Sequence, residues 1–171
     1  ASIGNHDKAA WVGYQSKLQS RLNQIEGADC TGDLGVNSAC TYKGIFFLLS
    51  GIGTLGSNHT KYMRTELKKS DAIWKICSWH KNQRLMQVGG KSDGVGWSVY
   101  EECRSAGAII ATGHEHSYSR THLMSSFKSQ KIASYSNNIV LSKGESFAFV
   151  SGLGGFSFHY QNWNHFTQPM I

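Results

Sequence analysis

Three short stretches of the chain carry side chains that bind metal ions in proteins. Residues 4–7 read GNHD, residues 77–80 read CSWH, and residues 113–116 read GHEH. Neutral imidazole nitrogens and amide oxygens are suitable ligands for divalent ions. The candidate ligands in these stretches are Asn5, His80, His114 and His116, with His6 beside the first.

Strand-like segments lead into two of these three stretches. AIWKICSWH (72–80) predicts a buried strand that ends in His80, and AGAIIATGHEH (106–116) predicts a strand that runs into His114 and His116. Ligands of open α/β sheets gather at the carboxyl ends of strands. We therefore expect the three stretches to meet at one edge of one sheet.

Helical and strand-like segments alternate along the first two thirds of the chain. The expected helices cover 11–25, 61–70 and 95–107, and the expected strands cover 41–51, 72–80 and 106–116. Gly27 can end the first helix. Beyond residue 117 the pattern changes to candidate short strands at 117–124, 137–142 and 146–155. This alternation indicates an α/β fold, and the length suits one domain over residues 1–171.

Charge and hydropathy narrow the classes of partner. The formal net charge is +6 and the pI about 9.2, but the basic residues are scattered and form no run. A nucleic-acid partner is therefore not expected. No apolar run reaches the roughly 18 residues of a membrane span, so no membrane partner is expected either. No signal-peptide pattern is present, although one could lie upstream.

Cysteine spacing and one sequon favour a secreted, extracellular protein. Cys30 and Cys40 bracket a turn-rich loop, CTGDLGVNSAC, which predicts a local disulfide, with Asp33 as a turn residue. Cys77 and Cys103 are left open between a second disulfide and buried free thiols. Asn58 begins the sequence Asn-His-Thr, a possible N-glycosylation site.

The order GNHD, CSWH, GHEHSYSR resembles the calcineurin-like metallophosphoesterases, and the last stretch is especially similar to purple acid phosphatases. The resemblance spans roughly residues 3 to 155 and implies a β-sandwich flanked by helices. It also implies hydrolysis of small-molecule phosphoesters at a dinuclear centre. The two divalent or trivalent ions would be Fe, Zn or Mn.

The resemblance also implies roles for individual residues. Asn5, His80 and His114 would bind one metal ion, and His116 would bind the other. His6 would lie over the substrate phosphate as an acid or charge-stabilising group, and Asp7 could orient its imidazole. Tyr118 and Arg120 occupy matching positions in supporting roles, with simple packing and a structural ion pair as their respective alternatives.

The chain departs from the family pattern before GNHD. The motifs D-x-[HG] and G-D-x-x-[YN], the second of which supplies the carboxylate that bridges both metals, are missing. The chain is thus expected to be the C-terminal part of an incomplete domain, without its N-terminal strands, and to hold at most one metal ion with little turnover. The missing half, or another chain, is expected to cover the exposed sheet edge.

Three interpretations remain open. The chain is part of a larger metallophosphoesterase, or a degenerate, non-catalytic relative that acts in binding or assembly. The third is a basic module that binds nucleic acid or carbohydrate through the aromatic segment 158–166.

Overall fold

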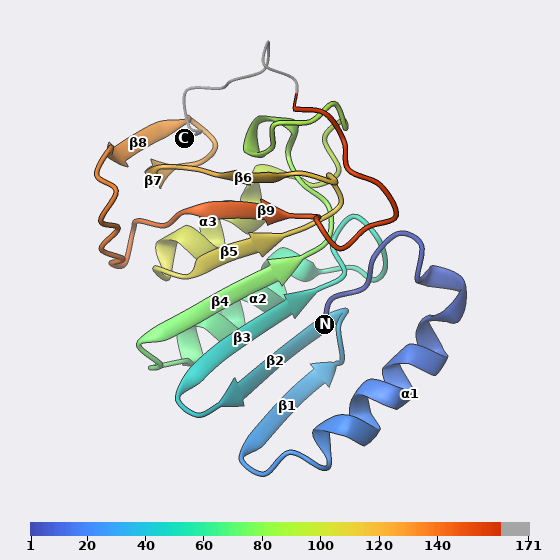
Figure 1. The fold of residues 1–171 in the computed structure, drawn as a ribbon. Coiled ribbons are helices and arrows are strands. Elements are labelled where there is room, and N and C mark those ends of the chain that lie inside the picture. The colour runs from blue at the N-terminus through green and yellow to red at the C-terminus, as the bar shows by residue number, and fades with distance from the viewer. Residues whose placement is uncertain (162–171) are drawn as a thin grey trace.

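The computed structural model describes residues 1–161, which form a mixed α/β fold (Figure 1). The main sheet has seven strands in the order β1-β2-β3-β4-β5-β9-β6. These strands are Ala28–Asp33 (β1), Asn37–Tyr42 (β2), Ile45–Ser50 (β3), Trp74–Trp79 (β4), Ile109–Thr112 (β5), Tyr118–Arg120 (β6) and Ala148–Ser151 (β9). A separate two-stranded sheet pairs Leu123–Ser126 (β7) with Lys131–Ser134 (β8).

The centre of the main sheet is parallel. Strands β3, β4, β5 and β9 run in the same direction, whereas β1 and β2 add an antiparallel hairpin at one edge and β6 pairs antiparallel with β9 at the other. The carboxyl ends of β4 and β5 therefore meet at the same edge of the sheet. His80 directly follows β4, and His114 follows β5 after one residue.

Two of the three α-helices in the described part of the chain cover one face of this sheet. Helices α2 (His59–Lys69) and α3 (Trp97–Ser105) lie behind the strands in Figure 1. Alternate side chains of the strands pack with them into the main core, where the ring of Trp79 meets the ring of Tyr100 edge-on at 4.9 Å between centroids. The remaining helical elements are α1 (Trp11–Leu22) and the short 3-10 helices η1 (Lys8–Ala10) and η2 (Arg84–Met86).

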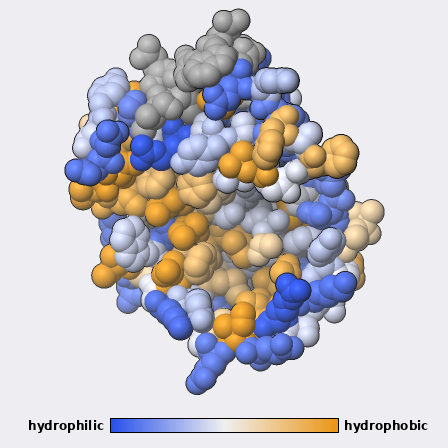
Figure 2. Space-filling view, in the orientation of Figure 1, coloured by the Kyte–Doolittle hydropathy of each residue, from blue (hydrophilic) through white to orange (hydrophobic). Residues whose placement is uncertain are grey.

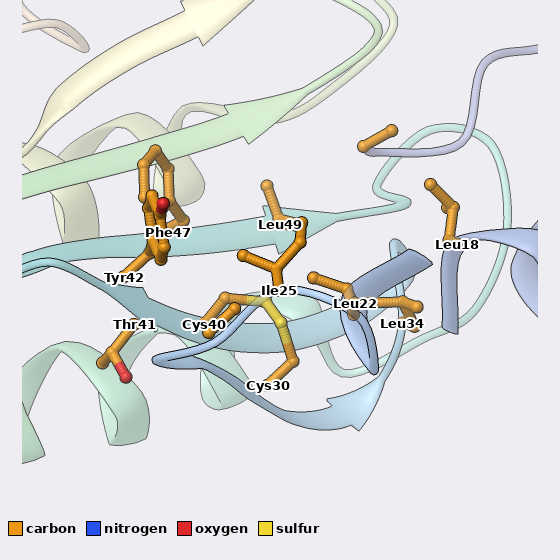
Figure 3. A pocket seen from close by; sticks show the side chains of 12 residues that line it. Leu18, Leu22, Ile25, Cys30, Leu34, Cys40, Thr41, Tyr42, Phe47 and Leu49 are labelled. Atoms are coloured by element: carbon orange, nitrogen blue, oxygen red, sulfur yellow. A yellow bond between two sulfur atoms is a disulfide. The ribbon is translucent and has the colours of Figure 1, made fainter. Parts of the chain in front are cut away.

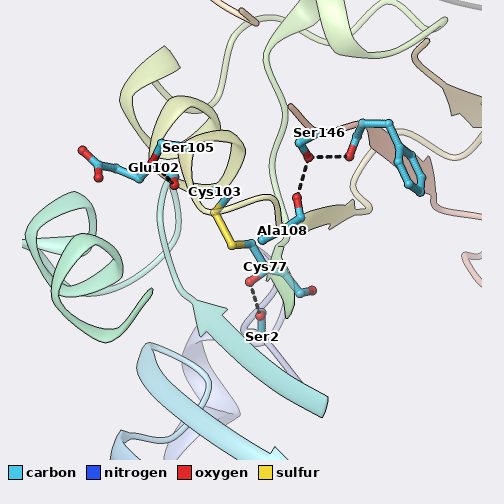
Figure 4. The surroundings of a disulfide bond; sticks show 9 residues. Ser2, Cys77, Glu102, Cys103, Ser105, Ala108 and Ser146 are labelled. Carbon is cyan, nitrogen blue, oxygen red and sulfur yellow. Dashed lines mark hydrogen bonds between the residues drawn. A yellow bond between two sulfur atoms is a disulfide. The ribbon is translucent and has the colours of Figure 1, made fainter. Parts of the chain in front are cut away.

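Two disulfides reinforce this arrangement. Cys77 on β4 is bonded to Cys103 on α3, and both residues are fully buried (Figure 4). This bond fixes α3 to the strand that precedes His80, and it answers the pairing that the sequence left open. A second disulfide joins Cys30 on β1 to Cys40, its directly opposed partner on β2. Two disulfides are compatible with an oxidising compartment.

The opposite face of the main sheet is apolar and largely open. Phe47, Ile76 and Ile109 are register partners across β3, β4 and β5, and all three are only partly buried. Their chain neighbours Phe46, Cys77 and Ile110 are buried under the helices. Figure 2 shows hydrophobic side chains gathered over the strands on the face toward the viewer.

Helix α1 covers only the hairpin side of the open face. Its Leu18 and Leu22, together with Ile25, lie opposite Phe47 and Leu49 across a cavity of about 330 Å³ (Figure 3). The Cys30–Cys40 disulfide lines the same cavity. Helix α1 is anchored near its start by Trp11 and by hydrogen bonds from Gln15, whereas its second half faces this cavity.

The structure differs from the sequence-based expectations in several segments. The segment 41–51, expected as one strand, contains the end of β2, a turn at Lys43 and Gly44, and β3. The segment 30–40, expected as a loop, is a β-hairpin, in which the carbonyl of Asp33 closes the turn by accepting from the N–H of Val36 at 2.9 Å. The expected strand over 137–142 is wrong, since this segment forms no strand and Val140 is 75% exposed. The first helix ends at Leu22 rather than at residue 25.

Within residues 1–161, none of the helices has the length and apolar character needed to cross a bilayer.

Neighbouring isoleucines on β5 provide a test of the open face. Ile110 is fully buried under the helices, so Ile110→Ala should lower the free energy of unfolding by about 2 to 5 kcal/mol. Ile109 points to the open face, so Ile109→Ala should cost less than half as much. Urea unfolding of both variants measures the difference, and equal losses would contradict an uncovered face.

The two disulfides should stabilise the fold unequally. Cys77 and Cys103 are 26 residues apart and Cys30 and Cys40 are 10 apart. Chain entropy then assigns about 3.5 kcal/mol to the first bond and about 2.7 kcal/mol to the second. Urea unfolding of the two double Cys→Ala variants should show the larger loss for the first pair, because its removal also disturbs the core. The reverse order would contradict this prediction.

Candidate metal centre

The GNHD loop is anchored by a small apolar cluster rather than by a preceding strand. Ile3 is fully buried against Trp11 and Val36, and its N–H donates to the carbonyl of Gly35 at 3.2 Å. Gly4 leaves no room for a side chain, because a Cβ there would lie 2.8 Å from Asp7 Oδ2 and 3.3 Å from His80 Cε1. This close approach brings Asn5 to the end of β4.

Strand pairing brings His80 and His114 together. The N–H of Gly113 donates to the carbonyl of His80 at 3.1 Å, which continues the pairing of β4 and β5 beyond their ends. The two imidazole rings meet edge-on with 4.8 Å between their centroids. Both rings are partly buried at the carboxyl edge of the sheet.

Two of the predicted ligand atoms lie close to a third, His80 Nε2. His80 Nε2 lies 2.7 Å from Asn5 Oδ1 and 3.0 Å from His114 Nδ1. Two ligand atoms that each lie about 2.1 Å from a metal ion at a right angle are themselves about 3.0 Å apart. Both of these spacings therefore fit pairs of ligands on one metal ion.

The hydrogen-bonding capacity of these groups also fits a cation. A neutral imidazole nitrogen carries either one proton or one lone pair. If His80 Nε2 carries a proton, it can donate a hydrogen bond to Asn5 Oδ1 or to His114 Nδ1, but one proton cannot form good hydrogen bonds to both. If His80 Nε2 and His114 Nδ1 each carry a lone pair, these two atoms and Asn5 Oδ1 are all acceptors. A positive ion between them would then interact favourably with all three lone pairs.

His114 adopts a backbone conformation that is uncommon for residues other than glycine. Its φ angle is +64°, in the left-handed region, where a Cβ crowds the following carbonyl oxygen. Such conformations cost of order 1–3 kcal/mol and cluster at functional sites. Here the turn after β5 brings the ring of His114 against His80.

Burial and nearby cations keep both rings neutral. Burial lowers the pKa of His80 to about 4, with a further contribution from the Lys91 ammonium, and Asp7 opposes the shift only in part. The pKa of His114 is also lowered to about 4 by burial, then by Lys91 and by His80. Neutral imidazole is the form that binds metals.

The other predicted site residues lie outside this group of three. His6 is exposed at the loop surface, and the Asp7 carboxylate accepts from the N–H of Gly4 at 2.9 Å rather than from the His6 ring. Tyr118 is 50% exposed at the start of β6, and Arg120 ends that strand. Asn58 is exposed just before α2.

His116 has a different neighbour, which the sequence did not identify. Its ring stacks on that of His159 with 4.4 Å between centroids, and its buried Nδ1 has no hydrogen-bond partner among the described residues. His159 also donates from its backbone N–H to the His116 carbonyl at 2.9 Å, and its Nδ1 is bonded to the fully buried Glu115. His159 lies in the aromatic segment 158–166, of which residues 162–166 are outside the described part.

The described residues contain no group of three or more His, Cys, Asp or Glu side chains arranged to hold a metal ion. This agrees with the composition of the group of three, which consists of two imidazoles and one amide. A carboxylate ligand, which hard divalent ions prefer, is what it lacks. The chain thus offers three neutral ligand atoms for one ion.

Comparisons with known proteins indicate a fold relationship. No protein-family model and no curated protein sequence matches the chain. Among solved structures, a purple acid phosphatase from seeds of yellow lupin (Lupinus luteus) is similar, with a TM-score of 0.61 and 16% sequence identity over 72% of this chain. PhoD matches 74% of the chain with a TM-score of 0.38 and 11% identity.

The chain spans only about a quarter of the length of these structures, 24% and 28% respectively. At this level of identity the likeness concerns the fold alone. It supports a mixed α/β domain with a large sheet, of the kind found in the lupin phosphatase.

Because the backbone at His114 is left-handed, the usual order of stability of alanine and glycine variants should be reversed at this position. Glycine normally destabilises a position relative to alanine by roughly 0.5–1 kcal/mol. At position 114, His114→Gly should instead be more stable than His114→Ala by about 1 kcal/mol, because only glycine adopts this φ without strain. Thermal unfolding of the two variants measures the difference.

The matched control is His80, which has no positive φ. There His80→Ala should be at least as stable as His80→Gly. The same order at both positions would contradict a strained backbone at His114.

Proposed function

We propose that this chain forms the part of a metal-dependent phosphoester hydrolase that holds one metal ion of its dinuclear centre. The supporting observation is that His80 Nε2 lies 2.7 Å from Asn5 Oδ1 and 3.0 Å from His114 Nδ1 at the carboxyl edge of parallel strands. The fold relationship to a phosphatase supports the same proposal. An Fe, Zn or Mn ion held there would act as a Lewis acid toward a phosphoryl oxygen.

The residues of the chain then have distinct tasks. Asn5, His80 and His114 bind the ion, and the stacked ring of His116 offers a ligand for the second ion. His6, exposed next to Asn5, is free to donate a proton to the leaving oxygen or to stabilise its charge. Asp7 positions the loop through Gly4, and His6 only indirectly.

The two nearby carboxylates each already accept hydrogen bonds within the chain. Asp7 accepts from the Gly4 N–H, and Glu115 is buried against His159 and the Lys91 N–H. We propose that the carboxylates that would complete the site of the second ion come from outside these 171 residues. For the same reason, a non-catalytic binding role at a single-metal site is the second candidate function.

The open face of the sheet supports a further part of this proposal. In a sandwich fold, a second sheet would cover the row formed by Phe47, Ile76 and Ile109. We propose that additional chain from the same protein, or another chain, packs on this face. Without that cover, exposed apolar surface favours association of the isolated chain.

Metal binding tests the assignment of ligands. The 171-residue chain, dialysed against Mn²⁺ or Zn²⁺, should hold about one ion per chain. His80→Ala and His114→Ala should each lose this ion, because either change removes one of three ligands. His6→Ala should retain it, as should the matched control His122→Ala, whose ring packs against Tyr135 away from the site.

Elemental analysis of the dialysed proteins gives the stoichiometry. The assignment would be contradicted if the wild-type chain bound no metal ion, or if His122→Ala lost the ion as completely as the ligand variants.

Hydrolysis of an aryl phosphate distinguishes an enzyme from a non-catalytic binding protein. The isolated chain should turn over little, and in the naturally occurring protein His6→Ala should slow hydrolysis by about 10²- to 10⁴-fold with metal content unchanged. A natural protein that binds metal without hydrolysis would favour the binding role.

A further inference from the structure

Two lysines lie beside the imidazole pair, and neither belongs to the proposed ligand set. Lys81 directly follows His80, and the Lys91 ammonium donates to the backbone carbonyl of His114. Both ammonium groups act electrostatically on the His80 and His114 rings. The positive charge near the site therefore comes from the loop between β4 and α3.

Lys91 is fixed by its backbone as well as by its side chain. Its N–H donates to Glu115 Oε2 at 3.3 Å, and its carbonyl accepts from Gln87 Nε2 at 2.6 Å. Glu115 and Gln87 are both almost completely buried. These contacts fix the backbone of Lys91, and the hydrogen bond to the His114 carbonyl places its ammonium.

The loop that carries Lys91 is built to approach Glu115 closely. A Cβ at Gly89 would lie 1.9 Å from Glu115 Cδ, so only glycine fits there. The stem of Lys81 is similarly packed, since a Cβ at Gly94 would lie 2.8 Å from its Cβ. Both lysines are thus attached to the site by tight backbone packing.

Neither ammonium forms an ion pair with a carboxylate within residues 1–161, although the charge of Glu115 acts on the Lys91 ammonium. Glu115 has one oxygen bonded to His159, and its other oxygen accepts from the Lys91 N–H. Asp7 is engaged by Gly4. An ammonium has three donors, and Lys91 uses one of them on the His114 carbonyl. The remaining donors are available to an oxyanion.

We propose that Lys91, assisted by Lys81, binds the phosphoryl oxygens of the substrate next to the His80–His114 pair. This inference rests on the proposed function, because the metal site defines where the phosphoryl group lies. It adds a binding element that does not depend on the metal. The chain should consequently bind a tetrahedral oxyanion such as inorganic phosphate even without metal.

Isothermal titration calorimetry tests this inference. Inorganic phosphate is titrated into the metal-free chain in the presence of a chelator. Lys91→Met should weaken phosphate binding by about tenfold or more, the loss expected for one charged hydrogen bond. Lys91→Arg, which keeps the charge, should retain affinity within a few-fold. Lys68→Met is the matched control, because Lys68 is exposed in the last turn of α2.

Lys81→Met should weaken binding less than Lys91→Met, and Gly89→Ala should weaken it by displacing the Lys91 loop. Near-ultraviolet circular dichroism checks that each variant remains folded. Phosphate affinity unchanged in both Lys91→Met and Lys81→Met, or no phosphate binding by the wild-type chain at millimolar concentration, would overturn the inference. Equal weakening in Lys68→Met would overturn it as well.

The proposed function fails in a distinguishable way. Loss of metal but not of phosphate in His80→Ala supports both proposals. Phosphate binding that depends on Lys91, in a chain that binds no metal, supports the anion site and contradicts the metal site. Metal binding together with unchanged phosphate affinity in the lysine variants leaves the proposed function standing and removes the lysine role.

Discussion

The parallel pairing of β4 with β5 is the constraint on which the candidate site depends. It aligns the ends of two strands so closely that the Gly113 N–H still reaches the His80 carbonyl beyond the last paired residues. The imidazoles of His80 and His114 meet only because of this register. The buried Cys77–Cys103 disulfide links the same strand to α3, so the histidine pair follows a strand that is covalently attached to a helix.

The electrostatics of the site are unusual for a hydrolytic metal centre. Its three proposed ligand atoms are neutral, its nearest carboxylates are engaged with backbone N–H groups or His159, and two ammonium groups lie beside it. Cations nearby disfavour a metal ion but favour an anion. Carboxylates from outside the chain would shift this balance toward metal binding, which explains how the same residues can suit both candidate functions.

Much of the fold could be predicted from the sequence. The segments that form α2, α3, β4 and β5 have apolar residues at helical or strand spacing and are bounded by polar or glycine residues. The β1–β2 hairpin could not, since β1 is a polar edge strand whose Gly, Asp and Thr residues are also typical of loops. The segment around Val140 misled in the opposite direction, because its apolar residues have no neighbouring strand to pair with.

The same distinction applies to the site. Asn5, His80 and His114 could be identified because they follow strands or belong to recognisable motifs. Lys91, Glu115 and His159 could not, because irregular loops with no periodic pattern bring them together. Glu115 is part of the GHEH stretch, but nothing in the neighbouring sequence indicated that its side chain is buried.

The cavity beside the second half of α1 gives the two parts of the site different surroundings. His80 and His114 follow strands of the central sheet, whereas Asn5 lies in the segment that leads into α1, the helix whose second half faces β3 across the cavity. Segments with little buried apolar contact open locally at low free energy, well below that of global unfolding. Any ligand that needs Asn5 together with the histidines binds only the closed form, so its binding energy would suppress this local opening. Occupancy of the site and order in the first helix are thus thermodynamically linked, even though α1 itself contributes no ligand.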